Sequence, residues 1–472
     1  PRPVRSTFLI PAPVSQPGMR RPTPRFAGAR RPANLRSSDA RVYPLMLTEK
    51  LIDPLDPKYR ALLEGIQGNI LKAHGRDYMT LVLLAFRSER MEAARQWIAD
   101  TGTQVGSALT LTEEAKAFRE GRPGGTFCSL LLSAAGCDAL GWLDRVPRSD
   151  GKRLSEFPRP PMGSDRGPDG VETDRFCVGM RRMAAALGDT GEARPKLPWE
   201  SPYAETCIHA MLIVAADRQD EVERQCQRAL TRPGADGLRW LGSEHGRRRT
   251  NADGLDVEPF GYVDGLSQPK FYAQDVAAER ATGGGTRVWD PAFPLSQVLV
   301  RTEEPTRETY GSFCVFRKLE QDVPGFDSSM RALADQLGLE ATDRERAGAM
   351  IVGRFPDGTP LQLQSKPGMA HPPTNDFDYH STPPAPVGGS DEGDGTRCPF
   401  HAHIRKANPR RETQRGAVLA RRGMPYGAAP LAQGETEGLL FLAYMASVEH
   451  QFLELQGNWM QDPAFPRRTL EF

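Results

Sequence analysis

Hydrophobic residues in the first half of the chain gather in short continuous runs, each followed by a segment of helical spacing. Residues 78–86 are almost wholly apolar, which is typical of a buried strand, and residues 89–99 continue with an amphipathic helical pattern. Further strands are expected at 127–133, 209–215 and 240–241, with helices at 134–140 and 220–230. This alternation predicts a sheet covered by helices.

The second half shows a comparable order of elements without an exact sequence repeat. Strands are expected at residues 311–317 and 438–444, and helices at residues 330–337 and 448–459. Strand-helix-strand units with hairpin-like returns are typical of antiparallel sheets with helices on one face. We therefore predict an α+β protein of two ferredoxin-like domains.

The predicted domains span residues 58–250 and 251–472, and a basic arm of residues 1–57 precedes them. The first 41 residues hold nine Arg and one Asp, and eight Pro fall within the first 32. This composition disfavours helices and β ladders, so we expect an extended arm that wraps its own domain or another subunit of a homo-oligomer. No aromatic-basic pattern continues into the fold, which argues against nucleic-acid binding.

Composition and cysteine usage limit the class of protein. The 472 residues carry a net charge of +1 and are 39% hydrophobic, which indicates a globular chain with more than one packed unit. No apolar run of about 18 residues exists, so no membrane span is predicted. The seven cysteines are scattered without a CxxC pair, and no apolar stretch follows the arginine pairs of the arm, which favours a cytoplasmic location.

Two long polar segments interrupt the pattern of strands and helices. Residues 146–206 and 355–397 are rich in Pro, Gly, Asp and Arg. Loops of this length usually serve a functional site or stay mobile. Both segments are expected to frame access to a cavity.

The segment Cys398-Pro-Phe-His-Ala-His403-Ile-Arg405-Lys-Ala-Asn-Pro-Arg410 places histidines beside several cations. A neutral imidazole is a common ligand of iron or zinc, and a basic setting suits an anionic cofactor, so a haem is the first candidate. The chain has no C-x-x-C-H segment, so any haem is expected to be held noncovalently. On a helix, His401 and His403 would point about 200° apart and could not both easily reach one iron.

Two further segments carry candidate chemistry. Gly261-Tyr-Val-Asp264-Gly265 sets a carboxylate between glycines, where the backbone can bend tightly beside a flat ligand. The simpler interpretation is a turn aspartate that caps its own backbone. The arginines of Leu419-Ala-Arg421-Arg422-Gly-Met-Pro-Tyr-Gly427 can stabilise an oxyanion or hold a propionate, although paired arginines are usually solvated.

Together, these three segments resemble the dye-decolorizing peroxidases, which are haem peroxidases built from two ferredoxin-like domains. The resemblance covers roughly residues 58–472 and includes Ile66-Gln-Gly-Asn-Ile-Leu-Lys-Ala-His-Gly-Arg76, residues 311–319 and residues 444–459. These motifs stand in the family's order. The long insertions resemble the larger fungal-like and actinobacterial-like branch.

The resemblance implies roles for individual residues. His403 corresponds to the proximal iron ligand, Asp264 to the distal acid/base and Arg421 to the distal cation. Arg421 is preferred over Arg422 because the family's arginine stands two residues before the position of Gly423. Three more residues are assigned to cofactor binding: Gly265, and Arg405 and Arg410, which would hold haem propionates or form salt bridges that fix the segment. His401 departs from the family, which usually has a small residue there.

The activity that the resemblance implies is oxidation of a dye-like or phenolic substrate by hydrogen peroxide, with one noncovalent haem b per chain. Asp264 would move the peroxide proton, and Arg421 would stabilise negative charge as the O–O bond lengthens. An aspartate with a reference pKa of about 3.9 still acts as a base in mild acid, which predicts an acidic optimum.

Two other classes stay open. One is a haem-handling protein that carries haem or releases its iron without turnover, and the other is a haem-free ferredoxin-like binding module. Electrons from bulky substrates could also travel through aromatic side chains, for which the available residues are Trp240, Trp289, Trp459, Tyr262, Tyr310 and Tyr426.

Overall fold

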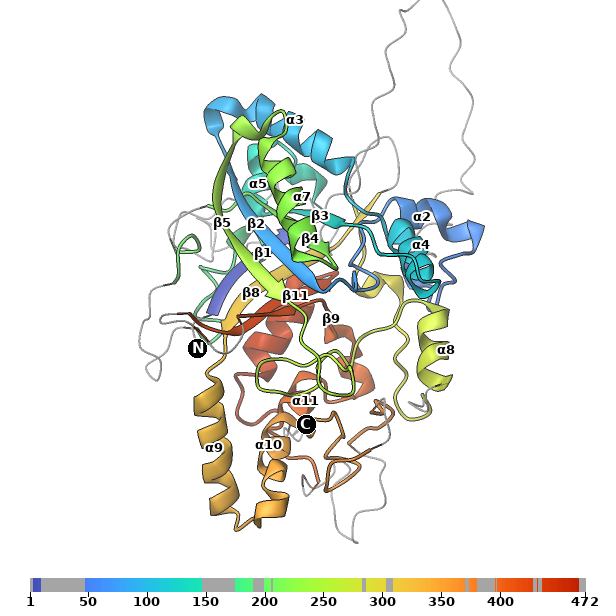
Figure 1. The fold of residues 1–472 in the computed structure, drawn as a ribbon, viewed down its shortest axis with the longest axis vertical. Helices are drawn as coiled ribbons and strands as arrows, with labels where there is room; N and C mark the ends of the chain where they lie inside the picture. The colour runs from blue at the N-terminus through green and yellow to red at the C-terminus, as the bar shows by residue number, and fades with distance from the viewer. Residues whose placement is uncertain are drawn as a thin grey trace, which may run out of the picture.

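The computed structural model describes residues 3–9, 47–146, 175–189, 199–204, 207–281, 286–302, 309–369, 373–379, 395, 397–427, 431 and 435–466. The main sheet contains the strands β1 (Pro3–Leu9), β2 (Tyr78–Phe86), β3 (Phe127–Leu132), β4 (Ala210–Ala216), β5 (Leu238–Arg247), β8 (Phe313–Glu320), β9 (Ala420–Arg421), β10 (Met424–Tyr426) and β11 (Gly438–Met445). They are antiparallel in the order β10-β11-β8-β1-β3-β4-β2-β5, and β9 also pairs with β11 (Figure 1). A separate ribbon joins β6 (Val300–Arg301) to β7 (Tyr310–Gly311).

Strands β2, β3 and β4 are almost wholly apolar because both of their faces are covered. Successive side chains of a strand point to opposite faces of the sheet. Leu81 and Leu83 of β2 accordingly belong to one core, whereas Val82 and Leu84 belong to the core on the other face. This burial explains why the sequence shows continuous apolar runs.

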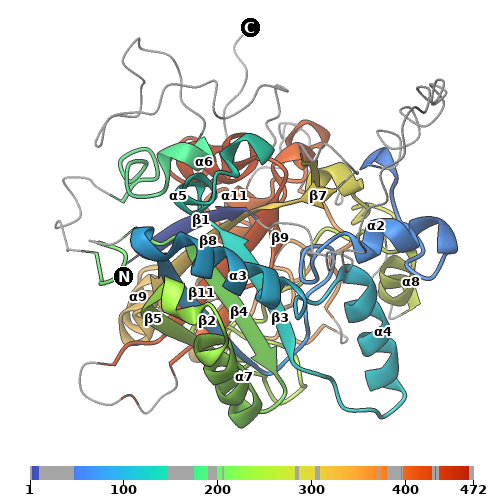
Figure 2. The same cartoon turned by 90° about the horizontal axis from the view of Figure 1, so that it is seen from above.

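Helices cover the sheet on the side of the second core. Trp97 of α3 (Met91–Gly102) and Val222 and Ala229 of α7 (Gln219–Thr231) pack into that core, and Figure 2 shows both helices over the strands. The remaining helices are α2 (Arg60–Glu64), α4 (Ala108–Arg119), α5 (Ala134–Ala139), α6 (Arg175–Val178), α8 (Ala273–Ala281), α9 (Val323–Gln336), α10 (Glu345–Val352), α11 (His403–Ala407) and the wider helix η10 (Val448–Trp459). The predicted α+β class is confirmed.

The two predicted halves are visible as two groups of strands. Strands β2 to β5 form one group and strands β8 to β11 the other, and β1 lies between β8 and β3. The two ends of the sheet also approach each other, since a Cβ atom at Gly246 of β5 would lie 3.1 Å from Met424 of β10. The residues at which one domain gives way to the next stay predictions.

The expectation that the arm stays out of β ladders is wrong for residues 3–9. All seven residues of β1 pair with β8, from Pro3 opposite Leu319 to Leu9 opposite Phe313. Proline is tolerated as the first residue of a strand, and the residues from Val4 to Leu9 contain no further proline. The arm residues 10–46 lie outside the described part of the chain.

Among the described residues, no helix combines the length and the apolar character needed to cross a membrane. All seven cysteines are free thiols. The long polar segments are described only in part: residues 175–178 form α6, and the described residues of 355–397 form turns without a regular helix or strand.

Candidate functional site

Asp264 stands on a loop that reverses the chain twice within five residues. Gly261 and Gly265 both have left-handed backbone angles, with φ of 88° and 78°, which only glycine adopts easily. The amide of Asp264 donates to the carbonyl of Asp256 at 2.9 Å, and Asp264 Oδ1 accepts a hydrogen bond from the amide of Gly265 at 2.6 Å. The side chain of Asp264 is 39% exposed, so its carboxylate is accessible.

Arg421 meets this carboxylate from strand β9. Its Nη1 lies 3.4 Å from Asp264 Oδ1, and 32% of its side chain is exposed. Its backbone amide donates to Gln268 Oε1 at 3.0 Å, and its Nη2 approaches the carbonyl of Ser267 at 3.4 Å. The loose ion pair leaves the second carboxylate oxygen of Asp264 open to another partner.

Arg422, the residue directly after β9, has its side chain directed to residues 69 and 70 and not to Asp264. It is buried and donates to the carbonyls of Asn69 and Ile70 at 2.9 and 3.0 Å, and to the carbonyl of Arg421 at 2.7 Å. Burial lowers the pKa of Arg422 to about 10. Arg422 therefore fastens residues 69–70 to β9, while Arg421 is the arginine that reaches Asp264.

His403 is the first residue of α11. Part of its ring is accessible, but protein surrounds the rest, and this burial lowers the pKa of the imidazole. The charge of Arg421 lowers the pKa further and that of Asp264 opposes it, so both groups act electrostatically on the ring. No described side chain forms a hydrogen bond with the ring, which stays neutral and able to bind a metal at neutral pH.

His401 lies in the turn before α11 and is exposed. Ala402, which is fully buried, separates it from His403. Both histidines are exposed as residues, and the difference between them is electrostatic, since the charges of Arg421 and Asp264 act on the ring of His403.

Arg405 and Arg410 are both buried within the protein. Arg405 donates to the carbonyl of Cys398 and lies 4.2 Å from the ring centre of Phe400. Arg410 donates to the carbonyl of Asn375 at 2.7 Å and to the carbonyl of Phe377, and burial lowers its pKa to about 10. These contacts favour the second of the two predicted roles, in which the arginines hold their own segment in place.

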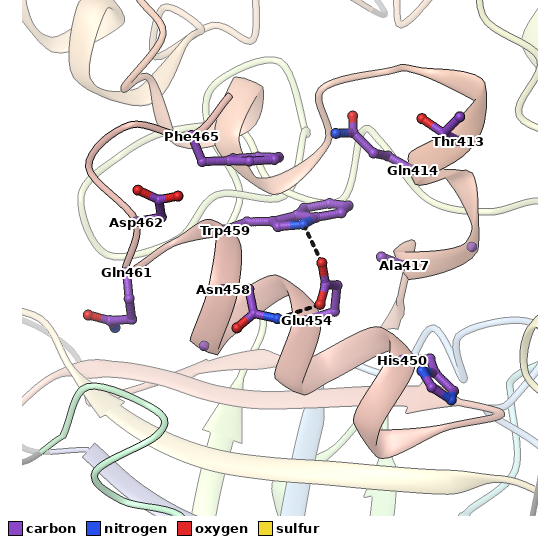
Figure 3. Close-up of a pocket in the computed structure, with 12 residues that line it drawn as sticks. Thr413, Gln414, Ala417, His450, Glu454, Asn458, Trp459, Gln461, Asp462 and Phe465 are labelled. Atoms are coloured by element: carbon purple, nitrogen blue, oxygen red, sulfur yellow. Dashed lines mark hydrogen bonds between the residues drawn. The ribbon is translucent and has the colours of Figure 1, made fainter. Parts of the chain in front are cut away.

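A pocket of about 730 Å³ lies elsewhere in the C-terminal half, between residues 413–417 and η10 (Figure 3). Trp459 stacks on Phe465 at its wall, with ring centres 5.0 Å apart, and donates from Nε1 to Glu454 at 2.9 Å. Asp264, Arg421 and His403 are not among the residues that line it. Of the aromatic candidates, Trp459 is thus placed beside a pocket, whereas Trp240 is exposed.

Some residues that shape the site were missed by the sequence analysis. Gln268 joins the Asp264 loop to β9, and Asn408, just after α11, lies 3.5 Å from Ser267 on the same loop. Both are polar residues beside a singled-out motif, followed directly by Pro269 and Pro409. A polar side chain before a proline in an irregular segment was the available signal.

Comparisons with known proteins identify the family of the chain. Residues 283–471 match the family model described as Dyp-type peroxidase, C-terminal. The multifunctional dye peroxidase DyP2 of Amycolatopsis is 37% identical over 426 residues, which cover 86% of this chain and 82% of that protein. Its solved structure aligns with a TM-score of 0.74 over 89% of this chain and 86% of its own.

Two further relatives widen the comparison. The structure of a DyP-type peroxidase from Anabaena has a TM-score of 0.73 and 32% identity, covering 89% of this chain and 87% of the other. A deferrochelatase of Shigella flexneri is 24% identical over 66% of each chain. The extent and identity of the match to DyP2, together with the shared fold, show that this chain belongs to the dye-decolorizing peroxidase family and is a DyP-type peroxidase.

Proposed function

We propose that the chain binds one noncovalent haem b through His403 and uses hydrogen peroxide to oxidise organic molecules such as dyes and phenols. Asp264 is the acid/base of the reaction with peroxide, and Arg421 is the cation beside it. The pairing of Arg421 Nη1 with Asp264 Oδ1 at 3.4 Å, within electrostatic reach of the neutral imidazole of His403, carries the proposal.

The residues present fit a haem. His403 offers a neutral imidazole, and Gly265 has no heavy atom within 4 Å of the place where a Cβ would stand, so the space beside Asp264 is open. Arg354 and Arg410 are buried, and their guanidinium groups donate to backbone carbonyls and to Asn375 Oδ1. Their positive charges would favour a cofactor with anionic propionates through the electrostatic field rather than by direct contact.

When bound, the haem would supply an iron that takes up peroxide and stores its oxidising power. The residues of the chain handle protons and charge. The open oxygen of Asp264 can accept the proton of the inner peroxide oxygen and return it to the outer oxygen, which leaves as water. Arg421 is charged at any accessible pH, so it stabilises the negative charge that grows on the outer oxygen.

The assignment of His403 is tested by absorption spectroscopy of haem-loaded variants. His403→Ala should lose the Soret band of a histidine-ligated haem because the axial nitrogen is gone. His401→Ala is the matched control, because it removes the same side chain two residues away, and it should keep the band. A normal Soret band in His403→Ala would overturn the assignment.

A haem-handling protein without turnover is the second candidate function, favoured by the similarity to a deferrochelatase. It would need His403 but not Asp264. Peroxide-driven bleaching of a dye should fall about 100-fold or more in Asp264→Asn, since general acid/base groups contribute this much. Asp253→Asn, a change on the preceding turn, serves as the control, and intact bleaching in Asp264→Asn would favour haem handling.

The proposals about substrate, oligomeric state and cellular location rest on the sequence. The reducing substrate is a small or dye-like organic molecule, and the chain is proposed to form a homo-oligomer. A cytoplasmic location stays a prediction, supported by the seven free thiols.

A further inference from the structure

The carboxylate of Glu258 organises the turn that leads into Asp264. Its Oε1 accepts a hydrogen bond from the amide of Tyr262 at 3.0 Å, and its Oε2 accepts one from the amide of Phe260 at 3.0 Å. The backbone closes the same turn, since the amide of Glu258 donates to the carbonyl of Tyr262 at 3.1 Å and the amide of Gly261 to the carbonyl of Glu258 at 2.8 Å. One side chain thus fixes two amides of a five-residue turn.

Glu258 also ties this turn to the end of strand β8. Gln321, the residue after β8, donates from Nε2 to Glu258 Oε2 at 2.6 Å. The other amide atom of Gln321, Oε1, is buried without a hydrogen-bond partner among the described residues. Among the described residues, the side chain of Gln321 therefore forms a hydrogen bond with Glu258 alone. This bond links the end of β8 to the turn.

Helix α9 braces the turn from the other side. Phe260 stacks on Phe326 with ring centres 4.3 Å apart, and Tyr262 meets the same ring edge-on at 6.0 Å. The hydroxyl of Tyr262 lies 3.3 Å from the sulfur of Met330. The turn therefore cannot shift without disturbing both the Glu258 hydrogen bonds and this aromatic cluster.

Only Val263 separates this turn from Asp264. The amide of Val263 donates to the carbonyl of Pro356 at 3.1 Å, and the amide of Asp264 to the carbonyl of Asp256 at 2.9 Å. Burial raises the pKa of Glu258, and the nearby Asp264 raises it further, whereas the hydrogen bonds from Gln321, Phe260 and Tyr262 oppose the rise. A partly buried carboxylate near a second carboxylate is costly, and in this turn the cost is offset by the three hydrogen bonds that Glu258 accepts.

We infer that Glu258 is a positioning residue for the peroxide reaction, because its carboxylate holds the turn that aims Asp264 at Arg421. This inference rests on the proposed function. Glu258 touches neither peroxide nor cofactor, and it acts through Asp264 alone. A displacement of about 1 Å at a catalytic group can lower a rate constant 100-fold, so the turn has leverage over the chemistry.

The test follows two rate constants of the haem-loaded protein by stopped-flow absorbance. In Glu258→Gln, the second-order rate constant for hydrogen peroxide should fall about 10- to 100-fold, because an amide cannot accept all three hydrogen bonds. The later rate constant for reduction by a small phenol should change less than twofold, and the Soret band should stay. Glu92→Gln, at a carboxylate that is 94% exposed, is the matched control.

A double variant separates positioning from general damage to the fold. If Glu258 acts only through Asp264, Glu258→Gln should add no further loss in the Asp264→Asn background. Gln321→Leu removes one of the three hydrogen bonds and should slow the peroxide reaction in the same direction but less. If Glu258→Gln fails to bind haem, the rate constant of Gln321→Leu for hydrogen peroxide tests the positioning role instead.

The outcomes distinguish the two levels of the proposal. If the Asp264→Asn protein reacts with peroxide as fast as the parent, the proposed acid/base role of Asp264, and with it the proposed function, is wrong. If Asp264→Asn is slow but Glu258→Gln, or Gln321→Leu in its place, stays within twofold of the parent, only the role of Glu258 is wrong. The same holds if the losses of Glu258→Gln and Asp264→Asn multiply, since independent effects would then be at work.

Discussion

Two adjacent arginines have different roles in this protein: Arg421 is the last residue of β9, and Arg422 follows it directly. Both belong to the same short motif, so composition alone could not separate them. Arg422 is buried among backbone carbonyls, whereas Arg421 reaches Asp264. The choice of Arg421, made from the position of Gly423, agrees with these contacts.

Substitution by methionine should mainly lower stability at Arg422 and mainly slow the reaction with peroxide at Arg421. Arg422→Met removes the donor to the buried carbonyls of Asn69 and Ile70 and should lower the free energy of unfolding by about 3 kcal/mol. Arg421→Met removes a half-exposed ion pair, which should cost less than about 1 kcal/mol, while it slows the reaction with peroxide. Urea unfolding and stopped-flow absorbance measure the two effects, and a reversed pattern would contradict the assignment.

The charges beside Trp289 and Trp459 indicate which of the two is more easily oxidised and so better suited to relay electrons. The Trp289 ring lies 5.1 Å from the guanidinium of Arg410 and 4.9 Å from that of Arg415, so loss of an electron would place three positive charges together. Trp459 instead donates its indole proton to the carboxylate of Glu454, which favours oxidation.

Substitution should reveal this ranking. Trp459→Phe should lower kcat/KM for a bulky dye about tenfold and leave a small phenol unaffected, whereas Trp289→Phe should change neither by more than about twofold. Steady-state kinetics with the two substrates makes the comparison. A larger loss of dye oxidation in Trp289→Phe than in Trp459→Phe would refute the electrostatic argument.

At the scale of elements, strands and amphipathic helices with strong local patterns were predictable. The apolar runs of β2, β4 and β11 predict that these strands are buried, as the structure shows. The strand β1 was not predictable, because its pairing with β8 depends on residues more than 300 positions away and its surroundings are rich in proline. The contact between Arg421 and Asp264 joins residues 157 positions apart, and only the family resemblance placed the two residues in one site.

Strand β1 should matter for stability, because it joins the two groups of strands. Deletion of residues 1–9 removes seven residues of ladder with β8 and leaves the edges of β8 and β3 without this partner. We expect the thermal midpoint to fall by several degrees and the tendency to aggregate to rise. Thr7→Pro, which breaks the ladder within β1, should act in the same direction, and an unchanged midpoint in both proteins would show that β1 contributes little.

At the scale of the whole molecule, a buried histidine couples stability to pH. His74 is enclosed, stacks on Phe127 at 5.3 Å and accepts a hydrogen bond from the amide of Arg76 at 3.0 Å. Burial, together with the cations Arg76 and Arg422, lowers the pKa of His74 to about 3. The folded state therefore keeps this ring neutral in acid that protonates it in the unfolded chain.

The sign of the effect follows from proton uptake. Below pH 6.5 the unfolded state binds a proton at His74 that the folded state refuses, so stability falls as pH drops toward about 3, by on the order of 4 kcal/mol. His74→Asn can still accept from the amide of Arg76 but does not titrate. Urea unfolding between pH 7 and pH 4 should show a flatter dependence in this variant, even if its stability at pH 7 is lower, and an equally steep dependence would exclude His74 as the cause.

The central place of β1 also bears on how the protein is made. Residues 3–9 are synthesised well before residues 313–320, which are their partner in the sheet. At about 5 to 20 residues per second, synthesis of the intervening chain takes roughly 15 to 60 s. During that time β1 can pair only with β3, through Leu9 and Leu132, and its long ladder with β8 cannot form. Completion of the sheet is therefore a late event in biosynthesis.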